Sequence, residues 1–283
     1  MADFFSQVKA STAGERLFQR LVDHGMKDLR SSRLGEQKFV RLTGRGAPFG
    51  TYLEGSMIAF AFKRIMKASH GIFRDKAVDR AICHAKLTVT LREWFGWLDR
   101  EDLGVLVRDA VRAHDASDKP IPKSIKTDIW HKRRIHKCCF CGTALTADSD
   151  SIVRDVQGNK ATLEHVWPSS LGGDSITDNL VPACANCNVK KGDLVTWEQG
   201  SVHEFIYPID FHLSDDFPRL PLVQKILLQR RAVVMLAQRE QISLKKALLR
   251  VGPFGDLKPL NSDDTWDIFN TQNHLDSLGE VLW

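Results

Sequence analysis

The stretch LEHVWPSSLGGDSITDNLVPACANCNVKKGD, residues 163–193, carries two kinds of chemistry in one short segment. Glu164 and His165 stand side by side near its start, and Cys184 and Cys187 form a Cys-x-x-Cys pair near its end. Such a cysteine pair is typical of a structural zinc site, which takes only sulfur or imidazole ligands and needs no neighbouring carboxylate. The Glu-His pair therefore indicates a second function beside the zinc.

The spacing of the cysteines predicts one closed zinc site. Cys138 and Cys141 form a second Cys-x-x-Cys pair upstream, and in a reducing compartment such pairs indicate metal thiolates rather than disulfides. Cys139 competes with Cys138 as a ligand, but Cys-x-x-Cys is the usual spacing, and Cys83 reads as a small buried apolar residue. Four thiolates complete a tetrahedral zinc, so we expect structural Zn²⁺ on Cys138, Cys141, Cys184 and Cys187.

The segment between the two cysteine pairs, residues 142–183, is longer than the dozen or so residues that separate the ligand pairs of a DNA-reading zinc finger. It contains a β-type run, ATLEHVWP, followed by the turn residues SSLGGDS. A second short strand, DNLVPAC, leads into a helix, ANCNVKKGD. The expected local structure is a β-hairpin followed by a helix.

These elements resemble the HNH endonuclease family, the ββα-metal nucleases, whose core is a β-hairpin and a helix that hold one divalent ion. The resemblance rests on several elements in a fixed order: the first cysteine pair, Glu164-His165, Pro168, Gly172-Gly173, Asp178-Asn179-Leu180, the second cysteine pair, Asn188 and Lys191-Gly192. It implies hydrolysis of a phosphodiester bond.

The resemblance assigns a role to each polar residue. His165 is the expected general base, because an imidazole with a pKa of about 6.5 can accept a proton from water at neutral pH. An isolated histidine is more often a packed core residue. Glu164 and Asn188 are the expected ligands of a catalytic Mg²⁺, or Mn²⁺, since hard cations prefer oxygen ligands. Asn179 is expected to tie the hairpin together and orient the histidine, although an Asn before a strand is often only a turn residue.

Two residues depart from the usual family pattern. Glu164 stands where an Asp is commoner, and Asn188 stands where the family name has a His. A longer carboxylate shifts the ion slightly, and an amide oxygen favours hard Mg²⁺ over softer ions. We expect these changes to affect metal preference more than activity.

Basic side chains near the hairpin are candidate contacts for a nucleic-acid backbone. Lys132, Arg133 and Arg134 belong to the run HKRRIHK just before the first cysteine pair. Lys190 and Lys191 are predicted to lie on the exposed side of the short helix. For the basic run, contact with the backbone is favoured over neutral surface, whereas Lys190 and Lys191 could equally be solvated surface.

The rest of the chain reads as helical, so the predicted fold class is α+β and mainly helical. Residues 1–125 are expected to form a basic helical region that binds DNA, with a capping box at Thr12 and Glu15 opening its first helix. Residues 126–200 are the expected HNH unit. Residues 201–283 are expected to be helical, with a strong helical pattern over 222–240 and an acidic tail.

The charge distribution favours a polyanionic partner. The formal net charge is +5, but residues 261–283 contain five acidic and no basic side chains, so the remainder carries +10. A merely basic surface is the alternative. No apolar run approaches the roughly 18 residues of a membrane span, and the first residues lack a signal-peptide core, so we expect a cytoplasmic protein without a membrane partner.

The leading hypothesis is a metal-dependent endonuclease that nicks one strand of double-stranded DNA and leaves 5′-phosphate and 3′-hydroxyl ends. The alternative is a zinc-stabilised nucleic-acid-binding module that does not cut. The joint presence of the Glu, the His and both Asn residues favours cutting, and no base-stacking sheet points to RNA.

A single HNH unit flanked by basic helical regions resembles nucleases of restriction, mobile-element and anti-phage systems, such as the nickase of Zorya, although the flanks themselves match no motif. This suggests antiviral defence, with protein partners of such a system. The acidic tail is interpreted either as a restraint on the basic cleft or as an ordinary terminal helix.

Overall fold

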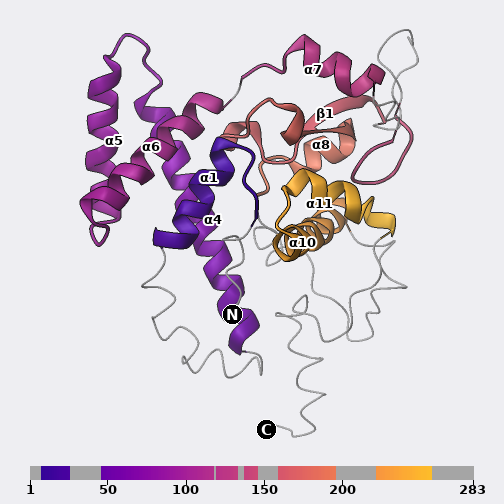
Figure 1. The fold of residues 1–283 in the computed structure, drawn as a ribbon, viewed down its shortest axis with the longest axis horizontal. Coiled ribbons are helices and arrows are strands. Elements are labelled where there is room, and N and C mark those ends of the chain that lie inside the picture. Colours follow the sequence, from indigo (N-terminus) through magenta and orange to yellow (C-terminus); the bar gives the residue numbers. More distant parts are fainter. Residues whose placement is uncertain are drawn as a thin grey trace, which may run out of the picture.

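The computed structural model describes residues 8–25, 46–117, 119–132, 137–145, 159–195 and 221–256. The described part is mainly helical, with a two-stranded antiparallel hairpin and a following helix near the middle of the chain (Figure 1). This confirms the predicted fold class. Residues 27–45, which include the basic side chains Lys27, Arg30, Arg33, Lys38, Arg41 and Arg45, lie outside the described residues. So do Arg133, Arg134 and the acidic tail 261–283.

The described part of the N-terminal region contains α1 (Ala13–Arg20), α4 (Gly46–Ile72), α5 (Arg80–Trp94) and α6 (Arg100–Ala116). The predicted capping box opens α1, because the Thr12 hydroxyl accepts from the backbone N–H of Glu15 and the Glu15 carboxylate accepts from the backbone N–H of Thr12. Asp79 and Asp99 cap α5 and α6 by a single side-chain bond each, accepting from the backbone N–H of Ala81 and of Asp102. Helices α1, α5 and α6 therefore each begin at a polar residue whose side chain accepts from an amide of the first turn.

The hairpin consists of β1 (Ala161–His165) and β2 (Leu180–Cys184). The strands are antiparallel, with His165 opposite Leu180 at the loop end and Ala161 opposite Cys184 at the other. Helix α8 (Ala185–Lys191) follows β2 directly, and the Cys184 sulfur accepts from the backbone N–H of Cys187 at the helix start. The predicted order of strand, strand and helix is confirmed.

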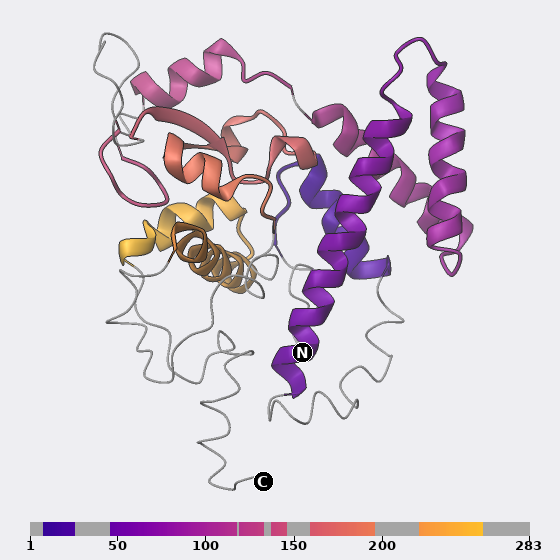
Figure 2. The ribbon, with the colours of Figure 1, turned by 180° about the vertical axis from the view of Figure 1, so that it is seen from behind.

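Helices α7 (Lys123–Thr127), α10 (Leu222–Glu240) and α11 (Leu244–Val251) surround the hairpin. In both views the hairpin and α8 lie between α7 on one side and α10 with α11 on the other (Figures 1 and 2). The bounds of α10 match the predicted helical pattern. Short 3₁₀ or π-helical turns occur at Leu21–Gly25, Asp128–Lys132, Ser169–Leu171, Thr177–Asn179 and Phe254–Asp256.

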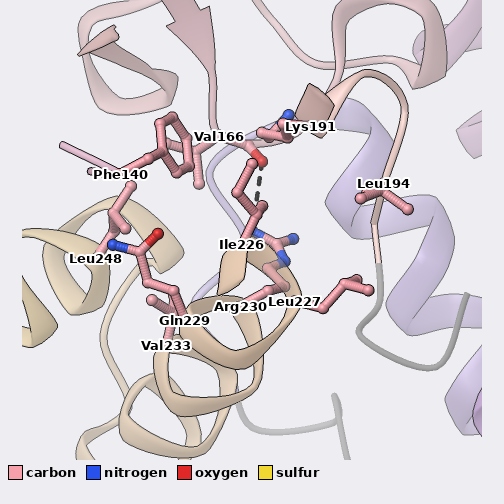
Figure 3. A pocket seen from close by; sticks show the side chains of 10 residues that line it. All are labelled: Phe140, Val166, Lys191, Leu194, Ile226, Leu227, Gln229, Arg230, Val233 and Leu248. Carbon is pink, nitrogen blue, oxygen red and sulfur yellow. Dashed lines mark hydrogen bonds between the residues drawn. The ribbon is translucent and has the colours of Figure 1, made fainter. Parts of the chain in front are cut away.

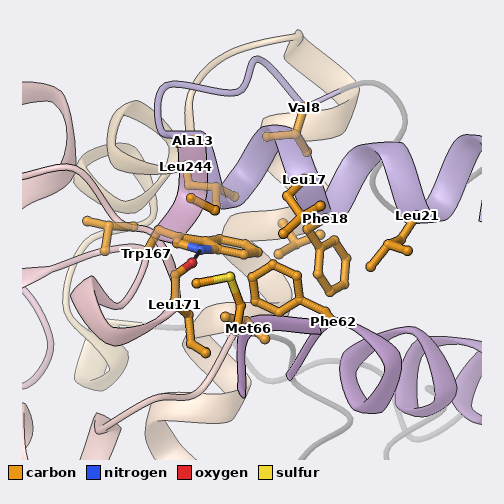
Figure 4. Packing of buried hydrophobic residues seen from close by; sticks show 14 of the residues in the cluster. Val8, Ala13, Leu17, Phe18, Leu21, Phe62, Met66, Trp167, Leu171 and Leu244 are labelled. Carbon is orange, nitrogen blue, oxygen red and sulfur yellow. Dashed lines mark hydrogen bonds between the residues drawn. The ribbon is translucent and has the colours of Figure 1, made fainter. Parts of the chain in front are cut away.

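One hydrophobic core joins the hairpin to the helices on both sides of it. Trp167, just after β1, is fully buried and meets Phe18 of α1 and Phe62 of α4 edge-on, with ring centroids 5.5 and 5.6 Å apart (Figure 4). Leu244 of α11 belongs to the same cluster. Aromatic pairs in this geometry add to the free energy gained by burial alone.

The start of α1 lies directly against the loop that follows β1. The backbone N–H of Gly14 donates to the carbonyl of Gly172 over 2.8 Å. A Cβ atom on Gly14 would lie 2.1 Å from the carbonyl oxygen of Leu171 and 2.3 Å from Nε1 of Trp167. Only glycine permits this close approach of helix and loop.

Among the described helices, none combines the length and the apolar content that crossing a bilayer requires.

Replacing Gly14 with Ala should lower the free energy of unfolding by about 1–3 kcal/mol, because backbone atoms must shift to admit the methyl group. Gly71 is the matched control, since a Cβ there meets nothing within 4 Å. Gly71→Ala should leave stability unchanged or raise it. Urea denaturation followed by circular dichroism measures both, and equal stability of the two variants would contradict the close approach.

Candidate metal and catalytic site

The four predicted zinc ligands come together in the structure. Cys138 and Cys141 lie on a turn, Cys184 ends β2 and Cys187 lies in α8, and their sulfur atoms all lie within 4.8 Å of one another. The sulfurs of Cys141 and Cys184 are 3.8 Å apart. Two sulfurs about 2.3 Å from a shared tetrahedral zinc are about 3.8 Å apart, so the cluster fits a structural zinc ion.

The thiols of the cluster interact strongly with one another. Hydrogen bonding to Cys141 raises the pKa of Cys138 to about 12, and the same contact lowers the pKa of the Cys141 thiol. Hydrogen bonds to Cys138 and Cys141 raise the pKa of Cys187. Crowded sulfurs resist carrying negative charge together, whereas a divalent cation among them would favour the thiolate form of all four.

The other two cysteines lie outside this cluster. The backbone of Cys139 links β2 to α10, because its N–H donates to the carbonyl of Pro182 and its carbonyl accepts from the Gln229 side chain, both over 3.0 Å. Burial raises the pKa of the Cys139 thiol to about 11. Cys83 is buried on α5 and its thiol donates to the carbonyl of Ile72, which confirms the prediction of a small buried residue.

His165 is the last residue of β1. Its Nε2 atom lies 3.0 Å from the hydroxyl oxygen of Ser175, and that hydroxyl donates to the carbonyl of Lys119 over 2.7 Å. The Ser175 hydroxyl therefore contacts the imidazole at Nε2, and His165 as a residue is partly exposed. Sequence analysis did not identify Ser175 or Lys119, which lie 10 and 46 residues from His165 along the chain.

Glu164 lies on the opposite face of β1 and forms a buried ion pair with Lys191. The distance from Lys191 Nζ to Glu164 Oε1 is 2.7 Å, and the two side chains are 4% and 9% exposed. Burial raises the pKa of Glu164 and lowers that of Lys191, while the attraction between them opposes both shifts. The prediction that Lys191 lies on the exposed side of α8 is therefore wrong.

Asn188 faces β1 from α8. Its Nδ2 atom donates to the hydroxyl oxygen of Thr162 over 3.1 Å. Thr162 and Glu164 share one face of β1, and Asn188 and Lys191 are three residues apart on α8, so Glu164 and Asn188 lie on facing surfaces. A carboxylate and an amide oxygen suit Mg²⁺, which usually keeps several waters and takes few protein ligands.

Asn179 is buried and its amide bonds the loop that follows β1. Its Oδ1 accepts from the backbone N–H of Trp167 over 2.7 Å, and its Nδ2 donates to the carbonyls of Trp167 and Asp174, both over 3.0 Å. These bonds fix the chain two residues after His165. The orientation of His165 by Asn179 stays a prediction.

Helix α10 supplies further hydrogen-bond donors to backbone carbonyls of the hairpin region. Arg230 is buried and donates to the carbonyl of Val195 over 3.0 Å and to that of Val166 over 3.3 Å. Figure 3 shows the bond between Arg230 and the carbonyl of Val166, beside a small, mostly apolar pocket that Lys191 also lines. No motif in the sequence singled out Arg230, because a basic residue within a helix usually indicates a solvated face.

The remaining predicted contacts for nucleic acid divide into two groups. Lys190 is exposed on α8. Arg133, Arg134 and the side chain of Lys132 lie outside the described part of the chain.

A family model described as HNH endonuclease matches residues 153–199. This segment is similar to an HNH endonuclease domain. The matched residues include Glu164, His165, Asn179 and Asn188, whereas Cys138 and Cys141 precede the match and join the domain through the sulfur cluster. No curated protein and no solved structure matches the chain at a significant level.

The Cys187→Ser variant should lose zinc, because a hydroxyl is a poor replacement for one of four thiolates in a closed site. Cys139→Ser is the matched control, since that thiol lies one residue from a ligand but outside the cluster. Elemental analysis of the purified proteins measures the zinc content. Full zinc content in Cys187→Ser, or its loss in Cys139→Ser, would contradict the assigned ligand set.

The Lys191→Met variant should lower the free energy of unfolding at pH 7 by about 3–5 kcal/mol, because it leaves a buried carboxylate without its charged partner. Lys190→Met, at an exposed position of the same helix, should have little effect. The double variant Glu164→Gln/Lys191→Met should recover most of the lost stability. Urea denaturation of the zinc-loaded proteins compares all three, and a double variant no more stable than Lys191→Met would argue against the pair.

Proposed function

We propose that this protein is a Mg²⁺-dependent endonuclease that nicks one strand of double-stranded DNA. The observation that carries the proposal is the match to the HNH endonuclease family over a hairpin whose histidine contacts Ser175 at one nitrogen and is partly exposed. The carboxylate and amide on the facing surfaces of β1 and α8 support it.

In this proposal His165 accepts a proton from the attacking water. Its Nδ1 is the nitrogen that can do so, since Nε2 faces the Ser175 hydroxyl. The water oxygen forms a bond to phosphorus and the bond to the 3′-oxygen breaks, which leaves a 5′-phosphate and a 3′-hydroxyl that takes a proton from solvent. When bound by Glu164 and Asn188, Mg²⁺ supplies positive charge for the phosphorane and the leaving oxygen.

The proposed DNA contacts follow from the exposed charges. Lys190 is exposed on α8, two residues after Asn188 and on a different side of the helix, and is a proposed contact for a phosphate that flanks the cut. Lys132, Arg133 and Arg134 remain proposed contacts on the basis of the sequence. Lys191 is no longer proposed as a contact for DNA, because it is buried in an ion pair with Glu164. One HNH domain has one active site, so a double-strand break would require two copies or two successive nicks.

A second candidate is a zinc-stabilised module that binds nucleic acid without cutting it. The ion pair between Lys191 and Glu164 favours this alternative, because the proposed metal ligand already has a charged partner. A carboxylate has two oxygens, however, and Lys191 binds Oε1. Partial exposure of His165, which a binding module does not need, supports cutting.

The biological setting is proposed from the resemblance of the sequence alone. It comprises a cytoplasmic role in defence against foreign DNA, with protein partners of such a system. In this role the nuclease would act on invading double-stranded DNA.

Incubation with supercoiled plasmid and Mg²⁺ should give relaxed circles with 5′-phosphate ends, and a chelator should stop the reaction. His165→Ala should lower the nicking rate by about 10²–10⁴-fold, because no base remains to accept the proton. His84→Ala, at an exposed position on α5, is the control and should nick at the wild-type rate. Wild-type activity in His165→Ala with normal zinc content would refute the proposed role of His165.

A further inference from the structure

Two hydroxyl groups beside the proposed site are each bound to a backbone carbonyl. The hydroxyl of Ser175, a buried residue, lies 2.7 Å from the carbonyl oxygen of Lys119 and 3.0 Å from Nε2 of His165. A carbonyl can only accept, so the single hydroxyl proton goes to Lys119. The Ser175 oxygen must then accept from His165, which puts the ring proton on Nε2 and the lone pair on Nδ1.

The hydroxyl of Thr162 fixes the orientation of the Asn188 amide by the same pattern of one bond donated and one accepted. Its hydroxyl donates to the carbonyl of Ala183 over 3.0 Å, so its oxygen can only accept from Asn188, 3.1 Å away. This places the amide nitrogen of Asn188 toward Thr162. The amide oxygen, the only one of the two atoms that can bind a cation, is then on the other side of the group.

We propose that Ser175 and Thr162 are positioning residues of the HNH site, an inference that rests on the proposed nuclease function. Ser175 sets the tautomer of His165, and Thr162 sets the amide orientation of Asn188. Neither hydroxyl touches the substrate or the ion. Each acts by making one orientation of its neighbour the only one with a complete hydrogen bond.

The two carbonyls that accept from these hydroxyls, those of Lys119 and Ala183, show which parts of the chain fix the orientations of His165 and Asn188. Lys119 belongs to the segment between α6 and α7, so the tautomer of the base depends on the chain that links the helical region to the hairpin. Ala183 immediately precedes the zinc ligand Cys184 in β2, so the orientation of Asn188 depends on the hairpin that the sulfur cluster holds. Partners of this kind, one shell away from a ligand, typically change metal affinity or activity about 10–100-fold when removed.

Removal of the Ser175 hydroxyl should slow the reaction without changing ion binding. Ser175→Ala should nick plasmid about 10–100-fold more slowly in single-turnover reactions, and Ser175→Thr, which keeps the hydroxyl, should retain most of the rate. Binding of Mn²⁺ to the zinc-loaded protein without DNA, measured by electron paramagnetic resonance, should be unchanged. In a His165→Ala background Ser175→Ala should cause no further loss, because a residue that acts through the histidine has nothing left to position.

Removal of the Thr162 hydroxyl should instead weaken ion binding. Thr162→Val keeps the branched shape that suits a strand, yet it should bind Mn²⁺ at least about 10-fold more weakly in the same resonance measurement, whereas Thr162→Ser should bind normally. Thr90→Val is the matched control, since Thr90 also donates to a backbone carbonyl over 3.0 Å, but on α5. It should bind Mn²⁺ as the wild type does.

The outcomes separate this inference from the function on which it rests. Wild-type nicking by His165→Ala would overturn the proposed function. An inactive His165→Ala beside a fully active Ser175→Ala would overturn only the positioning role of Ser175, as would a further loss of rate when the two changes are combined. Normal Mn²⁺ binding by Thr162→Val, or weak binding by Thr162→Ser, would overturn the role of Thr162.

Discussion

The burial of Trp167 is the constraint on which the arrangement of the whole molecule depends. This side chain comes two residues after His165, and it fills the space between α1 and α4 with its Nε1 donating to the carbonyl of Leu171 over 2.8 Å. The side chain of Asn179 accepts from the backbone N–H of Trp167 and donates to the Trp167 carbonyl. The indole therefore fixes the loop after β1 to the helical body, and the position of the imidazole follows from it.

The local parts of the site could be predicted from the sequence because each is a short-range pattern. The hairpin, α8 and the sulfur cluster follow from residues whose type and spacing admit few alternatives, and the capping box at Thr12 is likewise local. The bounds of α10 follow from its apolar periodicity. Helix α7 lacks such a signal, since it has five residues and buries none of them, and it follows two prolines.

The features that could not be predicted from the sequence are contacts between residues far apart in the chain. The sequence does not distinguish Lys190 from Lys191, which are neighbouring residues of the same type. Only the packing of α8 against β1 places Lys190 in solvent and Lys191 beside Glu164, which is 27 residues away in the chain. Ser175 and Arg230 were missed for the same reason, because their partners are brought near by the tertiary fold. A polar residue within a helix or a turn gives no indication in the sequence that its hydrogen-bond partner is a distant carbonyl.

Helix α8 shows why the two chemistries of the opening stretch occur together. It has seven residues, too few for a stable helix in water by itself, so its shape depends on what it packs against and on the cysteines at its start. Within those residues it carries a sulfur of the cluster at Cys187, the proposed ligand Asn188 and the charge partner Lys191. A metal that orders the first turn of α8 thereby orders all three groups, because successive turns of a helix have a fixed relation.

The Cys184 sulfur accepts from the backbone N–H of Cys187, so the link between hairpin and helix is made at the cluster itself. The sulfur cluster and the proposed ligand Asn188 therefore meet at neighbouring residues of one short helix, so the geometry of the proposed catalytic site depends on that of the cluster.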